Sequence, residues 1–177
     1  MPRTNPAAPP REAVQAEADK TQLTGEFDLA LRVFIALLLG LCIGAERELR
    51  GHPAGLRTMA LISAGSCMFT GLGLIPDFPK TVDPTRIAAQ IVTGVGFLGA
   101  GSILRQGELV RGLTTASTIW VAASLGMAVG FGYYWLAVFV TVVVVIVLFV
   151  LKPVEERIFR RRGHRRETDQ QQDEIHT

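Results

Sequence analysis

Apolar residues gather in five long runs along the chain, and short polar stretches separate the runs. The runs cover about residues 27–45, 54–75, 87–104, 113–131 and 133–151. A helix of about 17 to 25 apolar residues crosses the hydrocarbon core of a bilayer, which is roughly 30 Å thick. The pattern therefore predicts an all-α polytopic membrane protein with five transmembrane helices.

Polar segments flank this apolar region on both sides. Residues 1–26 are rich in Pro and Ala and lack the apolar stretch of a secretory signal, so we expect a disordered N-terminal tail. Residues 27–151 then form the five-helix transmembrane domain, and residues 152–177 form a basic tail. This tail either fixes the topology of the last helix or lies as a short helix on anionic lipid.

Arginines follow the first, third and fifth runs, whereas the segment after the second run balances acidic and basic residues. Short loops on the cytoplasmic side of a membrane carry an excess of Lys and Arg. The charge pattern therefore places the N-terminus outside and the C-terminus in the cytoplasm. The arginines in these three segments are Arg47, Arg50, Arg105, Arg111, Arg157, Arg160, Arg161, Arg162, Arg165 and Arg166.

The composition narrows the class of protein further. Of the 177 residues, 49% are hydrophobic and 19% are charged, which is too apolar for an ordinary soluble domain. The formal net charge of +2 is small, and the basic excess lies in the tail. We therefore expect the lipid bilayer as a partner and no nucleic acid.

Small residues recur four positions apart in four of the runs, a spacing that lets helix backbones approach closely. The segment GVGFLG at residues 94–99 also matches the dinucleotide motif GxGxxG. That motif requires a preceding strand, whereas this segment lies inside an apolar run, so helix packing is the expected role. The same faces permit a homo-oligomer. The glycines expected to pack are Gly40, Gly44, Gly94, Gly96, Gly99, Gly101, Gly126 and Gly130.

Polar residues inside the runs mark the faces that turn towards other helices. Such groups either hydrogen-bond one helix to another or line a polar pathway or pocket, and both alternatives stay open. The residues are Ser63, Ser66 and Thr70 in the second run, Arg86, Gln90 and Thr93 in the third, and Thr114, Ser117, Thr118 and Ser124 in the fourth.

The stretch GAERELRGHPAGLRT at residues 44–58 carries a dense group of charges between the first two runs. Glu46 and Arg50 stand four positions apart, which is the spacing of an ion pair on a helix. Arg57 falls in the first turn of the next helix, from where it could face Glu46 across the turn. The stretch is either a loop of topology-setting charges or a functional ion pair or ligand site.

Three long blocks of sequence are specific enough to suggest a family. They read GAERELRGHPAGLRTMALISAGS, TRIAAQIVTGVGFLGAGSILRQG and VRGLTTASTIWVAASLGMAVGFGYY, and they span about residues 40–134. The blocks resemble the MgtC/SapB family of bacterial membrane proteins. This resemblance implies a multi-pass protein of the cell inner membrane that acts in magnesium homeostasis, in adaptation to low magnesium and in virulence. It also implies a membrane-protein partner, the F-type ATP synthase.

The resemblance also implies which residues matter and where this chain departs from its relatives. Thr114 and Val121 stand where some members have Asn and Cys. Only about 25 residues follow Lys152, where many relatives carry a soluble ACT-like domain. The positions carried over are Glu46, Arg47, Glu48, Gly51, Gly55, Arg57, Thr58, Arg86, Gln90, Gly94, Gly96, Gly99, Gly101, Arg111, Gly112, Thr114 and Thr115.

Magnesium prefers several oxygen ligands, but the cores of the second to fifth runs contain no acidic residue. Glu46 is therefore the best candidate for a metal ligand. We expect no tightly bound cofactor, although Mg²⁺ is possible. Because no continuous acidic path is visible, transport of Mg²⁺ or another cation is the alternative function rather than the leading one.

Two further residue types argue against other kinds of site. His52, His164 and His176 lie in loops or in the tail without a nucleophile nearby in sequence, so we expect no enzyme. Cys42 and Cys67 should differ by roughly 13 Å in depth, which excludes a disulfide between them.

Overall fold

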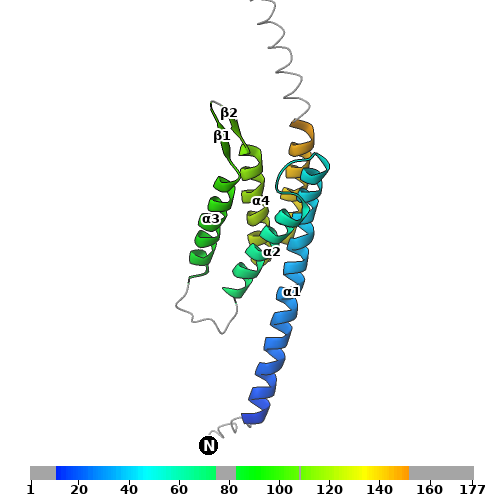
Figure 1. The fold of residues 1–177 in the computed structure, drawn as a ribbon. Helices are drawn as coiled ribbons and strands as arrows, with labels where there is room; N and C mark the ends of the chain where they lie inside the picture. Colours follow the sequence, from blue (N-terminus) through cyan, green and yellow to red (C-terminus); the bar gives the residue numbers. More distant parts are fainter. Residues whose placement is uncertain (1–10, 75–82, 108, 152–177) are drawn as a thin grey trace, which may run out of the picture.

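The computed structural model describes residues 11–74, 83–107 and 109–151. In this part of the chain five helices run up and down, and a two-stranded hairpin joins α3 to α4 (Figure 1). The predicted helical architecture is confirmed, and the hairpin is an addition that the apolar pattern did not indicate. The elements are α1 (Arg11–Leu49), α2 (Leu56–Leu72), α3 (Pro84–Gly101), β1 (Leu104–Gln106), β2 (Leu109–Arg111), α4 (Leu113–Gly130) and a C-terminal helix (Tyr134–Leu151).

The first helix, α1, extends further towards the N-terminus than the apolar run predicts. It begins at Arg11, so residues 11–26 are helical where the sequence predicts a disordered tail. The stretch EAVQAEADK accounts for this extension, because Ala, Glu, Gln and Lys are good helix formers. Residues 1–10 and the basic tail at 152–177, with its six arginines, lie outside the described residues.

Three of the described helices are long and apolar enough to cross a membrane. They are Leu23–Leu49 within α1, α4 at Leu113–Gly130 and the C-terminal helix at Tyr134–Leu151. Helix α2 has 17 residues, and α3 includes several polar residues among its 18, so neither meets that measure alone. The structure thus supports a membrane protein with three such helices.

The basic connections lie at one end of the molecule. Figure 1 places the turn after α1, the β1–β2 hairpin and the end of the C-terminal helix on the same side. Within the hairpin, Leu104 pairs with Arg111 and Arg105 pairs with Val110. This clustering is the arrangement expected if the arginines after alternate helices face one side of a membrane.

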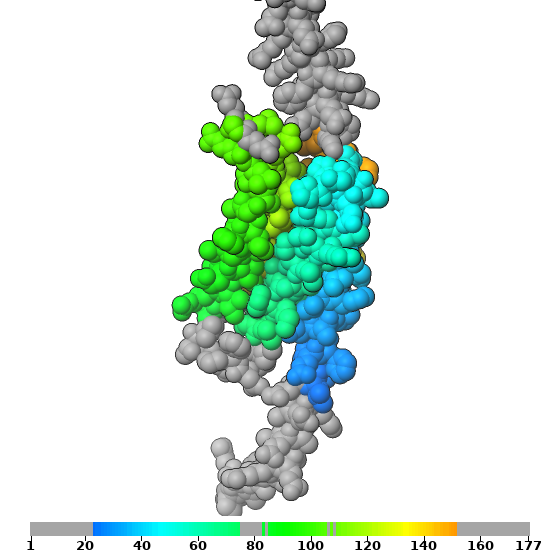
Figure 2. Space-filling model, in the orientation of Figure 1, coloured from blue at the N-terminus to red at the C-terminus, as the bar shows by residue number. Residues whose placement is uncertain are grey.

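The centre of the molecule is formed by α1, α2 and α4. Ile43 of α1, Met59 and Cys67 of α2, and Leu125 and Val129 of α4 are at most 2% exposed. Helix α3 packs mainly on α4 and touches α2 only lightly. Figure 2 shows α3 along the edge of the visible face, beside the surface of α2. Most of α3 is therefore outside the core.

The close approach of α1 to α2 depends on two glycines. A β-carbon at Gly40 would stand 2.5 Å from the carbonyl oxygen of Met59, and one at Gly44 would stand 2.7 Å from the Cα atom of Leu56. Both distances are too short for a real side chain. The backbones of the two helices can therefore meet only because these positions lack one.

Helix α4 meets α2 through glycines in the same way. A β-carbon at Gly126 would overlap the carbonyl oxygen of Ser63, and one at Gly130 would lie 2.7 Å from the Cβ atom of Thr70. Gly126 therefore faces the backbone of α2, and Gly130 faces the side chain of Thr70 on the same helix.

The glycines of α3 behave differently from those of α1 and α4. Gly99 makes an ordinary contact with Ala116, at 3.6 Å from its β-carbon position to the Ala116 carbonyl oxygen. At Gly94, Gly96 and Gly101 no described atom lies within 4 Å of that position. The sequence predicts packing at these three glycines, but a single copy of the chain does not provide it.

Candidate functional site

Two charged residues near the end of α1 are almost completely buried. Glu46 is 4% exposed and Arg47 is 2% exposed. Charges at such depth need partners, because removing them from water is costly. Together with Arg50 and Thr115, which bind them, these residues form what we call the buried charge cluster.

Glu46 pairs with Arg50 on the next turn of α1. The distance between Glu46 Oε1 and Arg50 Nε is 2.7 Å, so the ion pair predicted from the four-residue spacing is present. Arg50 also donates a hydrogen bond of 3.1 Å to the carbonyl oxygen of Phe149, and its guanidinium lies 4.5 Å from the centre of the Phe149 ring. Arg50 therefore connects α1 to the C-terminal helix.

Arg47 points to a different neighbour, the start of α4. Its Nη2 atom donates a hydrogen bond of 2.6 Å to the hydroxyl oxygen of Thr115, which is 3% exposed. Thr115 lies in the first turn of α4, and the N-cap residue Gly112, in the left-handed conformation at φ 92°, precedes that helix. The adjacent residues Glu46 and Arg47 thus bind α1 to two separate helices.

The turn after α1 is organised by Glu48. Its Oε2 atom accepts a hydrogen bond of 2.9 Å from the backbone N–H of Leu56, one of the first N–H groups of α2 that have no partner inside the helix. Arg57 and Thr58, on the same first turn, are exposed. Within the described residues Arg57 forms no salt bridge, so Arg50 takes the place beside Glu46 that the sequence allowed for Arg57.

The remaining predicted site residues lie away from the buried charge cluster. Arg86, Gln90 and Thr93 are exposed on α3, and Arg111 and Thr114 are exposed around the hairpin and the start of α4. Of the two neighbouring threonines, only Thr115 turns towards Arg47. The structure therefore separates three buried residues from the other predicted charged and polar site residues, which are exposed. The buried residues are Glu46, Arg47 and Thr115.

The sequence did not indicate a second arginine contact, which lies at the opposite end of the bundle. Arg32 forms a salt bridge of 2.7 Å with Asp28 and donates a hydrogen bond of 2.9 Å to the carbonyl oxygen of Gly130. Its position in an apolar run signals a buried or interfacial role. The contact with Gly130, 98 positions away, has no local signal in the sequence.

Two polar atoms of the buried charge cluster have no hydrogen-bond partner among the described residues, namely Glu46 Oε2 and Arg47 Nε. A resident Mg²⁺ at this carboxylate oxygen would need near-octahedral oxygen ligands. Glu46 is instead paired with Arg50 and is followed in the chain by a second buried cation, Arg47. The described residues contain no group of three or more His, Cys, Asp or Glu side chains that could hold a metal. The cluster therefore does not fit a resident Mg²⁺ ion.

Comparisons with known proteins agree with the resemblance seen in the sequence. Residues 33–157 match the MgtC family. The protein named "Putative magnesium transporter YhiD" of Escherichia coli (strain K12) is 41% identical over 148 residues, which cover 80% of this chain and 68% of that protein. Protein MgtC of Salmonella typhimurium (strain LT2) is 43% identical over 134 residues, which cover 75% of this chain and 56% of that protein.

Protein SapB of Bacillus subtilis (strain 168) is 47% identical over 114 residues. These residues cover 60% of this chain and 49% of that protein. The chain thus spans about half the length of MgtC and of SapB. No solved structure matches the chain.

Proposed function

This chain belongs to the MgtC family and is a membrane protein, and from this premise we propose that it crosses the bacterial inner membrane five times. The N-terminus lies outside and the C-terminus in the cytoplasm. Support comes from the alternating direction of the five described helices and from the arginine-bearing connections at one end of the molecule (Figure 1). Of the two less apolar helices, α2 crosses inside the bundle and α3 crosses at its edge, beside α4.

The proposed function is a role in magnesium homeostasis and adaptation to low magnesium, exercised through a membrane-protein partner and without catalysis by this chain. The family resemblance makes the F-type ATP synthase the first partner to test, and it extends the role to virulence in a pathogen. The observation that carries the proposal is the buried charge cluster. Its charges join α1 to α4 and to the C-terminal helix, so they stabilise a scaffold that can present a surface to a partner.

Transport of Mg²⁺ is the second candidate, and two observations favour it. The relative YhiD carries the name "Putative magnesium transporter YhiD". The Oε2 atom of Glu46 is also buried without a hydrogen-bond partner among the described residues. Against it, the neighbouring cations Arg47 and Arg50 repel a divalent cation. The two candidates differ in whether the purified chain moves Mg²⁺ by itself.

One experiment with two measurements separates the candidates. The chain is purified, inserted into liposomes and assayed for Mg²⁺ entry with a trapped Mg²⁺-sensitive dye. In parallel, detergent extracts of native membranes are examined by affinity purification and quantitative mass spectrometry. We expect no Mg²⁺ entry above empty liposomes, together with enrichment of a membrane-protein partner.

Two variants with the same change in charge make the comparison specific. Glu46→Gln alters the buried charge cluster, whereas Glu26→Gln alters an exposed carboxylate near the start of the apolar segment Leu23–Leu49 of α1. Loss of partner enrichment in Glu46→Gln alone supports the proposal. Mg²⁺ entry with the wild type and Glu26→Gln, abolished in Glu46→Gln, would establish transport instead.

A further inference from the structure

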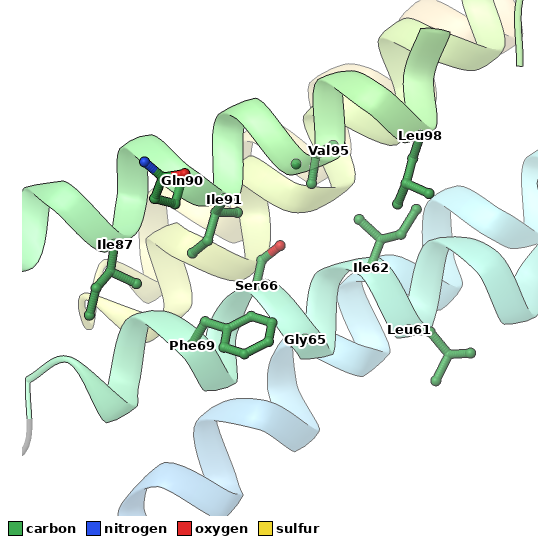
Figure 3. Close-up of a pocket in the computed structure, with 11 residues that line it drawn as sticks. Leu61, Ile62, Gly65, Ser66, Phe69, Ile87, Gln90, Ile91, Val95 and Leu98 are labelled. Carbon is green, nitrogen blue, oxygen red and sulfur yellow. The ribbon is translucent and has the colours of Figure 1, made fainter. Parts of the chain in front are cut away.

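The groove between α2 and α3 is an unfinished side of the helix bundle. It has a volume of about 510 Å³, and its walls are mainly apolar side chains such as Phe69, Ile91 and Leu98 (Figure 3). Phe69 and Leu98 at its rim are 61% and 51% exposed. The backbone is accessible at Gly65 and Gly94, where no described atom lies within 4 Å of a β-carbon position.

Two polar groups in this groove lack partners. Ser66 is 4% exposed, and Figure 3 shows its hydroxyl directed into the groove. Among the described residues that hydroxyl makes no hydrogen bond, and neither does the side-chain amide of Gln90, on the α3 wall. By contrast, Thr93 on the same helix satisfies its hydroxyl internally, by donating to the carbonyl oxygen of Ala89 at 3.0 Å.

Lipid chains are poor partners for these groups. Gln90 lies six residues after the start of α3, which is roughly 9 Å along the helix, so it reaches below the membrane surface if α3 spans the bilayer. An acyl chain neither donates nor accepts hydrogen bonds, and polar groups in the membrane usually face protein. The C-terminal helix, which is far more apolar, is a suitable lipid-facing wall.

We infer that this groove is an interface between two copies of the chain, in which the α3 helices pair about a two-fold axis along the membrane normal. All copies insert in one direction, so such an axis brings identical residues together at the same depth. A glutamine amide is both donor and acceptor, and two of them can therefore satisfy one another. The open backbone at Gly94, one turn further along, allows the helices to approach closely.

This inference rests on the membrane-spanning part of the proposed function and not on the role in magnesium homeostasis. It also gives Gly94 a packing role that a single copy does not provide.

The test measures association of the purified chain in liposomes by Förster transfer. The exposed Cys42 is replaced by Ala, the buried Cys67 is kept, and donor or acceptor dyes are attached at Leu109→Cys on the hairpin. Transfer is followed as the protein is diluted with lipid. We expect a dimer whose dissociation constant rises about 3- to 30-fold in Gln90→Leu, as loss of an interhelical hydrogen bond predicts. Thr93→Val is the matched control and should change the constant by less than about 3-fold.

A second measurement keeps Gln90 in place. A short thiol crosslinker should join copies that carry Leu98→Cys in the groove, and it should join Val142→Cys on the lipid-facing C-terminal helix much less. Equal crosslinking at the two positions would overturn the inference. So would Förster transfer that does not exceed the level expected from random collisions of the proteins. In either case lipid or another protein occupies the groove. Carbonate extraction separates the failures: an inserted but monomeric chain overturns only the pairing, whereas an extracted chain overturns the membrane topology as well.

Discussion

Arg47 of α1 donates a hydrogen bond of 2.6 Å to the hydroxyl of Thr115 on α4, across 68 positions of sequence. Both residues are at most 3% exposed. The contact fixes the rotation of α1 relative to α4 at the end of the bundle where the arginines gather (Figure 1). It therefore links the charged stretch at the end of α1 to the start of α4.

Removing the Thr115 hydroxyl should destabilise the protein. Thr115→Val keeps the shape of the side chain but leaves the Arg47 guanidinium without its acceptor, at a cost of about 1.5–3 kcal/mol in the free energy of unfolding. Reversible unfolding in mixed micelles measures the change. Thr114→Val is the matched control, because Thr114 is exposed, and should stay within about 0.5 kcal/mol. Similar losses in both variants would contradict the assigned contact.

Arg50 should stabilise the protein because it neutralises the buried carboxylate of Glu46. In Arg50→Gln the Glu46 carboxylate, 4% exposed, loses its ion pair, and breaking a buried pair in this way typically costs about 3–5 kcal/mol. The double variant Glu46→Gln with Arg50→Gln removes both charges and should be more stable than Arg50→Gln alone. A double-mutant cycle on unfolding free energies measures this coupling. Simple additivity of the two single changes would show that the pair contributes nothing.

The two kinds of glycine should respond in opposite ways to alanine. Gly126→Ala places a methyl group against the Ser63 carbonyl and should lower the free energy of unfolding by about 1–3 kcal/mol. Gly94→Ala enters open space and should not destabilise a single copy, since Ala favours a helix more than Gly does. Its effect should fall on association instead. Thermal denaturation at high lipid dilution measures the stability of a single copy of each variant. A loss of stability in Gly94→Ala equal to that in Gly126→Ala would count against the prediction.

Asp83 should make the start of α3 sensitive to acid. Its carboxylate accepts a hydrogen bond of 2.9 Å from the backbone N–H of Thr85, and this bond lowers the pKa of Asp83 below its ordinary value. A lowered folded-state pKa stabilises the protein above the unfolded-state pKa, and the contribution is lost as the pH falls through the folded-state pKa.

In the proposed topology this residue faces the exterior. Asp83→Asn keeps a capping side chain but cannot titrate. In this variant the local stability of α3 should therefore fall less as the pH is lowered into the acid range. Amide hydrogen exchange of α3 between neutral and strongly acidic pH measures the difference. An unchanged acid limb in Asp83→Asn would assign that limb to other groups.

The local features of this protein can be predicted from its amino-acid sequence alone. The apolar runs located the helices, because each helix is a continuous segment with its own length and polarity. The Glu46–Arg50 pair also followed from spacing, since positions four apart always meet on a helix. The start of α1 and the β1–β2 hairpin were exceptions, because a polar helix and a short hairpin leave no long apolar run.

Which helices meet, and through which faces, becomes visible in the folded structure and not in the sequence. Glycine spacings occur in α1, α3 and α4 alike, yet the structure packs those of α1 and α4 against α2 and leaves Gly94 and Gly96 open. Arg50 and Phe149 are 99 positions apart in the sequence, so their contact depends on the order and rotation of whole helices. A small-residue pattern states that a close contact is possible, but the partner is chosen by the combined packing of all the helices at once.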